Sequence, residues 1–360
     1  MRGIANVAGD DGGAVGRIRP PARSRSHSWL PLPLPLRVVL ASLSQRPANS
    51  SMYEMSSEEN SSLLEPQKRV EDAEPVDWLA ELSRFDYGQY LLAAVIFLAA
   101  EITLRVAGPR QVPFYVSDAT VWYPFLPETV PMFGVVLFAC FTVPCMALLE
   151  VLAMNGTGRR RLFAAARFAL AGATAAVHTL AFVEFTKFFV GELRPYFGTL
   201  CTGLPMPPAQ YDGRTILSND MCTGTATEAQ LNEARMSFLS GHASVSFALA
   251  VTLAAHLWLR AATIARASSV SSSLLSAASI ATWKRRAVSQ VLCVVAWLPL
   301  GFAGWVALTR VRDFRHHVWD ITSGSALGVV LGLAIFVPIA HSIHQDYYCR
   351  HKSEHSNEYS

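Results

Sequence analysis

Residues 132–154 read MFGVVLFACFTVPCMALLEVLAM, and Glu150 carries the only charge in this run. A helix needs about 20 apolar residues to cross the hydrocarbon core of a bilayer. Because lipid offers the backbone no hydrogen-bond partners, a run of this kind crosses as a helix. The segment therefore predicts a membrane-spanning helix.

Five further apolar runs have a similar length. Together the six predicted spans are Gly88–Val106, Met132–Met154, Phe163–Lys187, His242–Ala261, Val288–Leu308 and Ile321–His341. The composition agrees, since only 16% of residues are charged against about a quarter in soluble domains. The net charge of +3 gives no reason to expect a nucleic-acid partner. We predict an all-α integral membrane protein with six transmembrane helices.

Basic residues between the runs orient the predicted bundle. Arg159–Arg161 lie between the second and third runs, and Arg266 and Lys284–Arg286 lie between the fourth and fifth. Short loops rich in Lys and Arg stay in the cytoplasm. Both termini are therefore predicted to be cytoplasmic, and the other three loops extracellular or lumenal. The sequence does not separate the plasma membrane from an endomembrane.

The segments outside the runs have a different composition. Tracts rich in Pro, Ser, Arg and Glu without a sustained period predict disorder. The predicted parts are a disordered cytoplasmic tail at 1–84, a six-helix domain at 85–343 with a flexible cytoplasmic insertion at 262–287, and a cytoplasmic tail at 344–360. The tract before Met52 differs from the acidic, serine-rich tract after it, so starts at Met1, Met52 and Met55 all stay open.

Polar residues gather in three clusters at the predicted outer ends of the runs. The clusters are Lys187 with Arg194-Pro195, then Ser240-Gly241-His242, then Thr309-Arg310 with His316 and Asp320. Folding of the bundle can bring these ends together. Three cations, two histidines and a carboxylate would then share one side of the membrane.

These residue types suit phosphoryl transfer without a metal ion. Cations neutralise the oxygens of a transferring phosphoryl group, and the helix start after Ser240-Gly241 favours an anion. Asp320 follows His316 by four residues, so it would share a helix face with His316 and orient its ring. One nitrogen of His316 would then be free to attack phosphorus, while His242 exchanges protons.

The three clusters resemble the signature of the type 2 phosphatidic acid phosphatase superfamily, which is K-x6-R-P, P-S-G-H and S-R-x5-H-x3-D. Here the motifs are Lys187–Pro195, Leu239–His242 and Thr309–Asp320. Leu239 stands in place of the usual Pro, and Thr309 in place of Ser. Neither change removes a charge or an imidazole.

The flanking residues narrow the resemblance to animal lipid phosphate phosphatases. They are residues 235–244, RMSFLSGHAS, residues 310–317, RVRDFRHH, and Pro113-Phe-Tyr in the first outer loop. The resemblance covers about Tyr87 to His341.

The resemblance implies dephosphorylation of phosphatidate, lysophosphatidate, ceramide phosphate or sphingosine phosphate through a phosphohistidine, without a cofactor or metal. It implies that His316 is the nucleophile, Asp320 its orienting partner and His242 the acid and base. The implied phosphate-binding residues are Lys187, Arg194, Ser240, Gly241 and Arg310. A catalytically silent lipid-binding or scaffold relative and a lipid phosphotransferase stay open as alternatives.

Two further patterns concern packing. Gly324, Gly328 and Gly332 have four-residue spacing, which permits close helix approach either inside the bundle or between subunits of a homo-oligomer. Cys201 and Cys222 share one predicted outer loop, where an oxidising compartment would preserve a disulfide. They are a candidate disulfide, and two free thiols are the alternative.

The predicted topology places Gly213, between the third and fourth runs, outside the cytoplasm. A glycosylation reporter inserted there should therefore be modified on the extracellular or lumenal side. A reporter in the loop at Arg159–Arg161 is the cytoplasmic control. Cytoplasmic exposure of the position near Gly213 would refute the orientation.

Overall fold

The computed structural model describes residues 87–153, 158–204, 206–207, 212–217, 221–270 and 277–346. The chain divides into two units, Met1–Asn49 and Ser50–Ser360, and all described residues belong to the second. The predicted tail at 1–84 and most of that at 344–360 therefore lie outside the described residues.

The described part of the chain is helical apart from one short pair of strands. In chain order the elements are α3 (Tyr87–Ala107), β1 (Phe114–Tyr115), the 3₁₀ turn η1 (Ala119–Val121), α4 (Met132–Ala153), α5 (Gly158–Val190), α6 (Phe197–Thr202), β2 (Ile216–Leu217), α7 (Glu228–Glu233), α8 (Gly241–Val270), α9 (Ala277–Val295), α10 (Trp297–Arg312) and α11 (Val318–His344). Strands β1 and β2 pair antiparallel, with Phe114 opposite Leu217.

Five helical stretches in the described residues are long and apolar enough to cross a membrane. They are Met132–Ala153, Arg161–Val190, Gly241–Arg266, Thr282–Arg312 and Val318–His344. The all-helical, multi-pass fold predicted from the sequence is confirmed to this extent. The apolar part of α3, Tyr90–Thr103, is shorter, so the sixth span stays a prediction.

The outward surfaces of the long helices are apolar. Leu92 on α3, Leu152 on α4 and Leu298 on α10 are among the exposed large side chains. Extensive exposed apolar surface is unusual where water is the solvent. These surfaces are suited to contact with the hydrocarbon chains of a bilayer.

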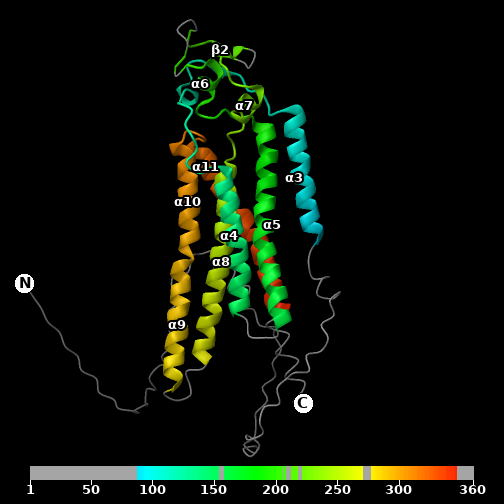
Figure 1. The fold of residues 1–360 in the computed structure, drawn as a ribbon, viewed down its shortest axis with the longest axis vertical. Helices are drawn as coiled ribbons and strands as arrows, with labels where there is room; N and C mark the ends of the chain where they lie inside the picture. Colours follow the sequence, from blue (N-terminus) through cyan, green and yellow to red (C-terminus); the bar gives the residue numbers. More distant parts are fainter. Residues whose placement is uncertain are drawn as a thin grey trace, which may run out of the picture. The chain divides into compact units, whose positions relative to one another are not determined.

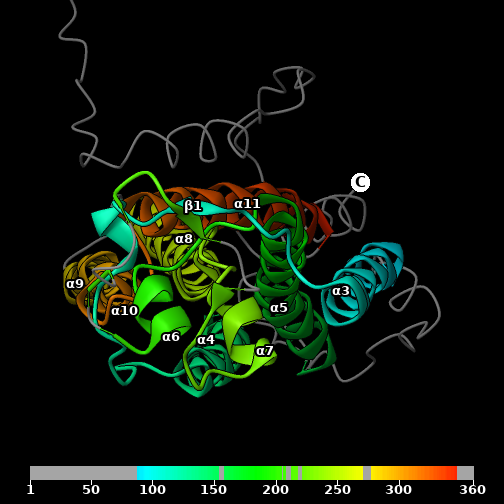
Figure 2. The same ribbon diagram turned by 90° about the horizontal axis from the view of Figure 1, so that it is seen from above.

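Helix α8 forms the centre of the bundle and packs against α4, α5, α9, α10 and α11 (Figures 1 and 2). Its contact with α11 is close because α11 presents glycines. A Cβ atom added to Gly324 would lie 2.9 Å from the Ser240 carbonyl oxygen, and one added to Gly328 would lie 2.1 Å from that of Ser244. These glycines therefore serve packing inside the bundle.

Helices α9 and α10 correspond to one predicted span, with a break at Ala296. Pro299 lies in the first turn of α10. Proline has no N–H to donate to the preceding turn, but the first turn of a helix leaves that donor unused. The sequence therefore ends one helix and starts the next at this point.

The predicted cytoplasmic insertion at 262–287 includes two helix ends. Helix α8 continues to Val270, and α9 begins at Ala277. Alanine, which occurs in both of these stretches, is the strongest helix former. The flexibility and the cytoplasmic location of the tract stay predictions. Residues 271–276 lie outside the described residues.

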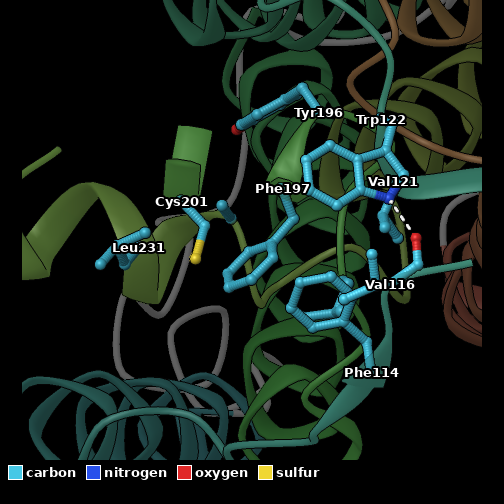
Figure 3. Packing of buried hydrophobic residues seen from close by; sticks show 10 residues of the cluster. Phe114, Val116, Val121, Trp122, Tyr196, Phe197, Cys201 and Leu231 are labelled. Carbon is cyan, nitrogen blue, oxygen red and sulfur yellow. Dashed lines mark hydrogen bonds between the residues drawn. The ribbon is translucent and has the colours of Figure 1, made fainter. Parts of the chain in front are cut away.

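Segment 108–131 and the described residues of 191–240 form a cap over one end of the bundle (Figure 1). The cap has its own apolar cluster, in which the Phe114 ring meets the Phe197 ring edge-on at 5.4 Å and Trp122 is also buried (Figure 3). The Trp122 indole N–H donates to the Val116 carbonyl at 3.1 Å. The cap thus joins the segment between α3 and α4 to the segment between α5 and α8.

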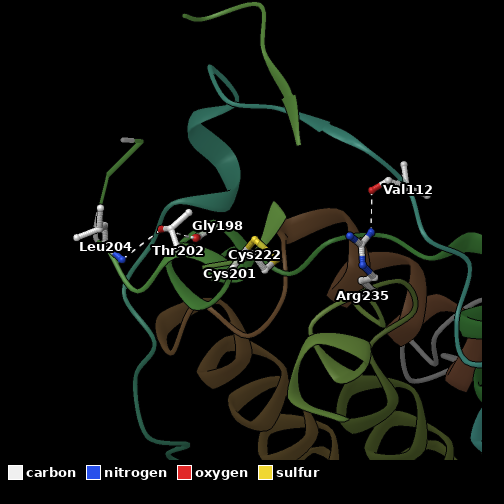
Figure 4. Close-up of a disulfide and its surroundings, with 7 residues drawn as sticks. All are labelled: Val112, Gly198, Cys201, Thr202, Leu204, Cys222 and Arg235. Carbon is white, nitrogen blue, oxygen red and sulfur yellow. Dashed lines mark hydrogen bonds between the residues drawn. A yellow bond between two sulfur atoms is a disulfide. The ribbon is translucent and has the colours of Figure 1, made fainter. Parts of the chain in front are cut away.

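A disulfide and a buried arginine add to the cap (Figure 4). Cys201 and Cys222 are bonded, with Cα atoms 4.6 Å apart, so the candidate pair is joined in the structure. The Arg235 guanidinium donates to the Val112 carbonyl at 2.7 Å and lies 4.5 Å from the Phe197 ring centroid. Burial lowers the pKa of Arg235 to about 10, which leaves it charged at neutral pH.

The close contact of α8 with α11 makes Gly328 sensitive to added volume. Gly328→Ala should lower the free energy of unfolding by about 1–3 kcal/mol, because the new methyl group would collide with backbone. Thermal unfolding of the purified protein in detergent measures this change. Gly301→Ala on α10 is the control, since no atom lies within 4 Å of its Cβ position. Equal effects of the two variants would contradict the packing argument.

Candidate active site

The three polar clusters of the sequence meet where the bundle joins the cap. Lys187 lies in the last turn of α5, and Gly241 begins α8. Arg310 lies in the last turn of α10, and Asp320 lies in the first turn of α11. Helix ends that are far apart in sequence thus surround one small volume.

Asp320 is fully buried and organises the start of α11. Its Oδ2 atom accepts hydrogen bonds from the Ser237 hydroxyl and, at 2.9 Å, from the His317 backbone N–H. The same oxygen lies 3.5 Å from Nδ1 of His316. The carboxylate therefore faces one ring nitrogen of His316 and leaves Nε2 for other contacts.

His316 is held in its neutral form. Burial lowers its pKa to about 4, and the positive charges of Arg194 and Lys187 act in the same direction, while the Asp320 carboxylate opposes them. A neutral imidazole has a lone pair available for attack. The influence of Arg194 and Lys187 also places both cations close to the His316 ring.

The second histidine lies among the remaining cations. His242 Nε2 is 3.5 Å from Nη1 of Arg310. Lys187 Nζ would lie 3.8 Å from a Cβ atom on Gly241, so the ammonium group is close to the start of α8. Ser240 is buried, and its backbone N–H donates to the Asp320 carbonyl at 3.4 Å.

Each cation of the site lies beside a carboxylate. Lys187 donates to Glu184 at 2.7 Å. Arg194 is 3.5 Å from Glu233. The Arg310 guanidinium has two such neighbours, with Asp313 at 3.1 Å and Glu128 at 3.5 Å. Lys187–Glu184 and Arg310–Asp313 are charge-assisted hydrogen bonds, and the other two contacts are ion pairs. These carboxylates hold the cations in place.

Sequence reasoning missed most of these carboxylates. Asp313 follows Arg310 by three residues, a helical spacing that could have indicated the pair. Glu128 and Glu233 carry no such local signal, because only the fold of the cap brings them to their partners.

Arg315, next to His316, is a buried cation. Its guanidinium lies 4.4 Å from the Phe125 ring centroid and donates to the Leu126 carbonyl at 2.6 Å. A cation over an aromatic face is stabilised by the ring quadrupole. Arg315 therefore anchors the segment between α3 and α4 to the site.

His317, the neighbour of His316, has two acidic side chains close by. Its Nδ1 atom lies 3.5 Å from Asp320 and 3.7 Å from Oε1 of Glu192. The ring stacks on Trp319 at 4.5 Å, and the Trp319 N–H donates to Glu192 at 2.6 Å. A small network of these residues thus extends from Asp320 toward Glu192.

This network also bears on metal binding. The sequence showed no group of ligands at metal-binding spacing. In the fold, one ligand atom each from Glu192, His317 and Asp320 lies within 4.8 Å of the others. Such a group has the spacing to hold a metal ion, although Asp320 already faces His316.

These features define a multi-pass membrane protein with cations and histidines gathered in a polar site at one end of the bundle. Residues 165–342 match the PAP2 superfamily, and this segment contains every cluster described above. The chain therefore carries a PAP2 superfamily domain over these residues.

Several relatives have enzyme names. Diacylglycerol pyrophosphate phosphatase 1 of Saccharomyces cerevisiae is 28% identical over 257 residues, covering 69% of this chain and 79% of the relative. Phospholipid phosphatase 2 of Mus musculus is 25% identical, covering 67% and 79%. Phospholipid phosphatase 1 of Rattus norvegicus is 24% identical, covering 68% and 82%. No solved structure matches the chain.

Glu192 makes the stability of the site depend on pH. Burial, followed by the nearby charge of Asp320, raises the pKa of Glu192 to about 7. The folded state therefore binds this proton more tightly than the unfolded state. The resulting stabilisation is present at low pH and is lost as pH rises toward about 7.

Glu192→Gln removes this ionisation and keeps an acceptor for the Trp319 N–H. We expect the variant to raise the melting temperature relative to wild type more at pH 8 than at pH 5. Thermal unfolding in a chelating buffer tests this without bound metal. Glu228→Gln, at an exposed position in the first turn of α7, is the control. A pH-independent difference for Glu192→Gln would contradict the assignment.

Proposed function

We propose that the chain is a lipid phosphate phosphohydrolase that works through a phosphohistidine intermediate without a metal ion. Its substrates are phosphatidate-type lipids, with phosphatidate, lysophosphatidate, ceramide phosphate and sphingosine phosphate as candidates. The yeast relative is named a diacylglycerol pyrophosphate phosphatase, so a lipid pyrophosphate is a further candidate substrate. The proposed site faces the extracellular or lumenal side of a plasma membrane or endomembrane.

One observation carries the proposal: a neutral buried histidine and a second histidine lie together among three cations. His316 is oriented by Asp320 at 3.5 Å, and His242 lies 3.5 Å from Arg310. Fixed cations stabilise the charge of a phosphoryl transition state in a site of low dielectric. The enzyme names of the relatives support the same reaction class.

In the first step, Nε2 of His316 attacks phosphorus while Arg194, Arg310 and Lys187 neutralise the phosphoryl oxygens. The bond between phosphorus and the lipid oxygen breaks, and protonated His242 gives its proton to the departing alkoxide. Asp320 stabilises the positive charge that develops on the His316 ring. The products are a lipid alcohol and a phosphohistidine.

In the second step, neutral His242 takes a proton from water as the oxygen attacks phosphorus. The bond between phosphorus and nitrogen breaks, which releases inorganic phosphate and restores neutral His316. His242 ends the cycle protonated, as it began. Water and the phosphate ester are the only reactants, so the cycle is balanced without a cofactor.

His316→Ala tests the nucleophile. Release of phosphate from a panel of lipid phosphates should fall by at least about a thousandfold, because the proposed reaction assigns the attack on phosphorus to His316. His317→Ala is the adjacent control and should stay within about tenfold of wild type. Radiolabelled substrate should leave an acid-labile, base-stable phosphoryl group on wild type but not on His316→Ala.

Added chelator extends the same assay. We expect phosphate release to continue in excess chelator. In the proposed reaction Lys187, Arg194 and Arg310 neutralise the phosphoryl oxygens, so no metal ion is needed. Strict dependence on magnesium would overturn the mechanism, as would loss of the phosphoenzyme in His317→Ala rather than in His316→Ala.

A further inference from the structure

A groove runs along the membrane-spanning part of the bundle between α4 and α10. Its volume is about 780 Å³, within the range of about 300–1,000 Å³ typical of ligand pockets. Helices α4 and α10 both pack on α8, so α8 forms the floor of the groove. Buried Leu253 and Leu257 of α8 line this floor.

The lining of the groove is almost entirely hydrocarbon. No charged residue contributes to it, and its walls include Leu137, Leu148 and Trp305. Phe138 and Phe302 also line it, with ring centroids 4.7 Å apart. An occupant of such a groove must be apolar along its length.

One end of the groove adjoins the polar site. Thr129 lines the groove, and its N–H and hydroxyl donate to the Asp313 carboxylate at 2.6 and 2.7 Å. The same carboxylate accepts from the Arg310 guanidinium at 3.1 Å. Thr129 and Arg310 thus contact the same carboxylate, so the groove begins close to Arg310, a proposed phosphate-binding residue.

The groove extends far from this end. It reaches Cys145 and Leu152 on α4, which begins at Met132. With a rise of 1.5 Å per residue, Cys145 lies about 20 Å along the helix from Met132. That depth exceeds half of a hydrocarbon core about 30 Å thick. Only a long chain anchored at the site would reach Cys145.

We propose that this groove binds an acyl chain of the lipid whose phosphate occupies the polar site. The proposal rests on the proposed function and deepens it, because it makes the enzyme selective for long-chain lipid phosphates. The occupant must be apolar, extended and attached to an anion. An acyl chain of a membrane lipid phosphate has all three properties. Binding of the chain in the groove would also hold the phosphate ester bond at a constant depth below His316.

Two cysteines of α4 give a matched pair of variants. Cys145 lines the groove, whereas Cys140 is exposed and does not. Cys145→Trp should obstruct the groove at its middle, and Cys140→Trp adds the same side chain outside it. Leu148→Trp is a second obstructing variant at an exposed position, where added volume leaves folding intact.

The experiment compares dioleoyl with dihexanoyl phosphatidate in detergent micelles, using the purified full-length chain. For Cys145→Trp and Leu148→Trp, we expect KM for the dioleoyl lipid to rise about tenfold, as loss of about two buried methylene groups would give. KM for the dihexanoyl lipid should not change, because that chain does not reach Cys145. Cys140→Trp should match wild type with both lipids. An equal change with both lipids, or no change with either, would overturn the proposal.

A binding measurement separates this proposal from the proposed function. Phosphatidate with a photoreactive group near its chain end should label α4 and α10 peptides around Cys145, even in His316→Ala. Cys145→Trp should remove this labelling. Labelling spread evenly over α3 and the other lipid-facing surfaces would indicate contact with bulk lipid only. Cross-links between two protein chains at Cys145 would indicate that a second copy of the protein occupies the groove. Either result would overturn the proposal. Specific labelling without hydrolysis of any lipid phosphate would support the groove and reject the phosphatase function.

Discussion

The close contact of α8 with α11 is the constraint on which the site depends. Gly324 and Gly328 bring the backbone of α11 against Ser240 and Ser244 of α8. At this distance the Ser240 N–H reaches the Asp320 carbonyl. The start of α8 carries His242, and the start of α11 follows His316. The contact between these helices therefore fixes the relative positions of the two histidines. Larger side chains on α11 would separate the two histidines.

A second buried interaction stabilises the bundle far from the polar site. Glu150, the lone charge of the run that first indicated a membrane helix, lies 2.7 Å from Arg260 and 3.2 Å from His256. The His256 ring stacks on Phe168 at 4.1 Å. A lone charge in a membrane helix costs up to about 2.5–3.5 kcal/mol on insertion scales, with the highest cost at the helix centre, and Glu150 lies in the last turn of α4. Pairing across α4 and α8 offsets that cost and fixes the relative positions of these helices.

The polar site pairs its cations with carboxylates. Glu184, Glu233 and Asp313 each accept from, or lie beside, one of the three cations. In the proposed reaction an entering phosphate would compete with these carboxylates for the same cations. Asp313 also accepts from Thr129 at the head of the apolar groove. One carboxylate thus connects the polar site to the apolar groove.

The amino-acid sequence by itself determined the membrane helices and the polar clusters. A run of apolar residues acts locally, because each segment must satisfy its own backbone hydrogen bonds in lipid. His316 and Asp320 are four residues apart, so the chain itself keeps them near one another. His316 nevertheless lies before α11, which begins at Val318, so the two residues do not share a helix face as their spacing predicted.

Tertiary structure alone decided the remaining contacts. Glu192 lies more than one hundred residues before His317, and Glu128 is still further from Arg310 in the chain. Their proximity depends on how the cap folds over the helix ends, which no local period encodes. The groove between α4 and α10 has the same origin, since its walls and floor come from segments that meet only when α8 occupies the centre. Sequence patterns describe which residues prefer lipid, water or a helix, whereas packing decides which of them touch.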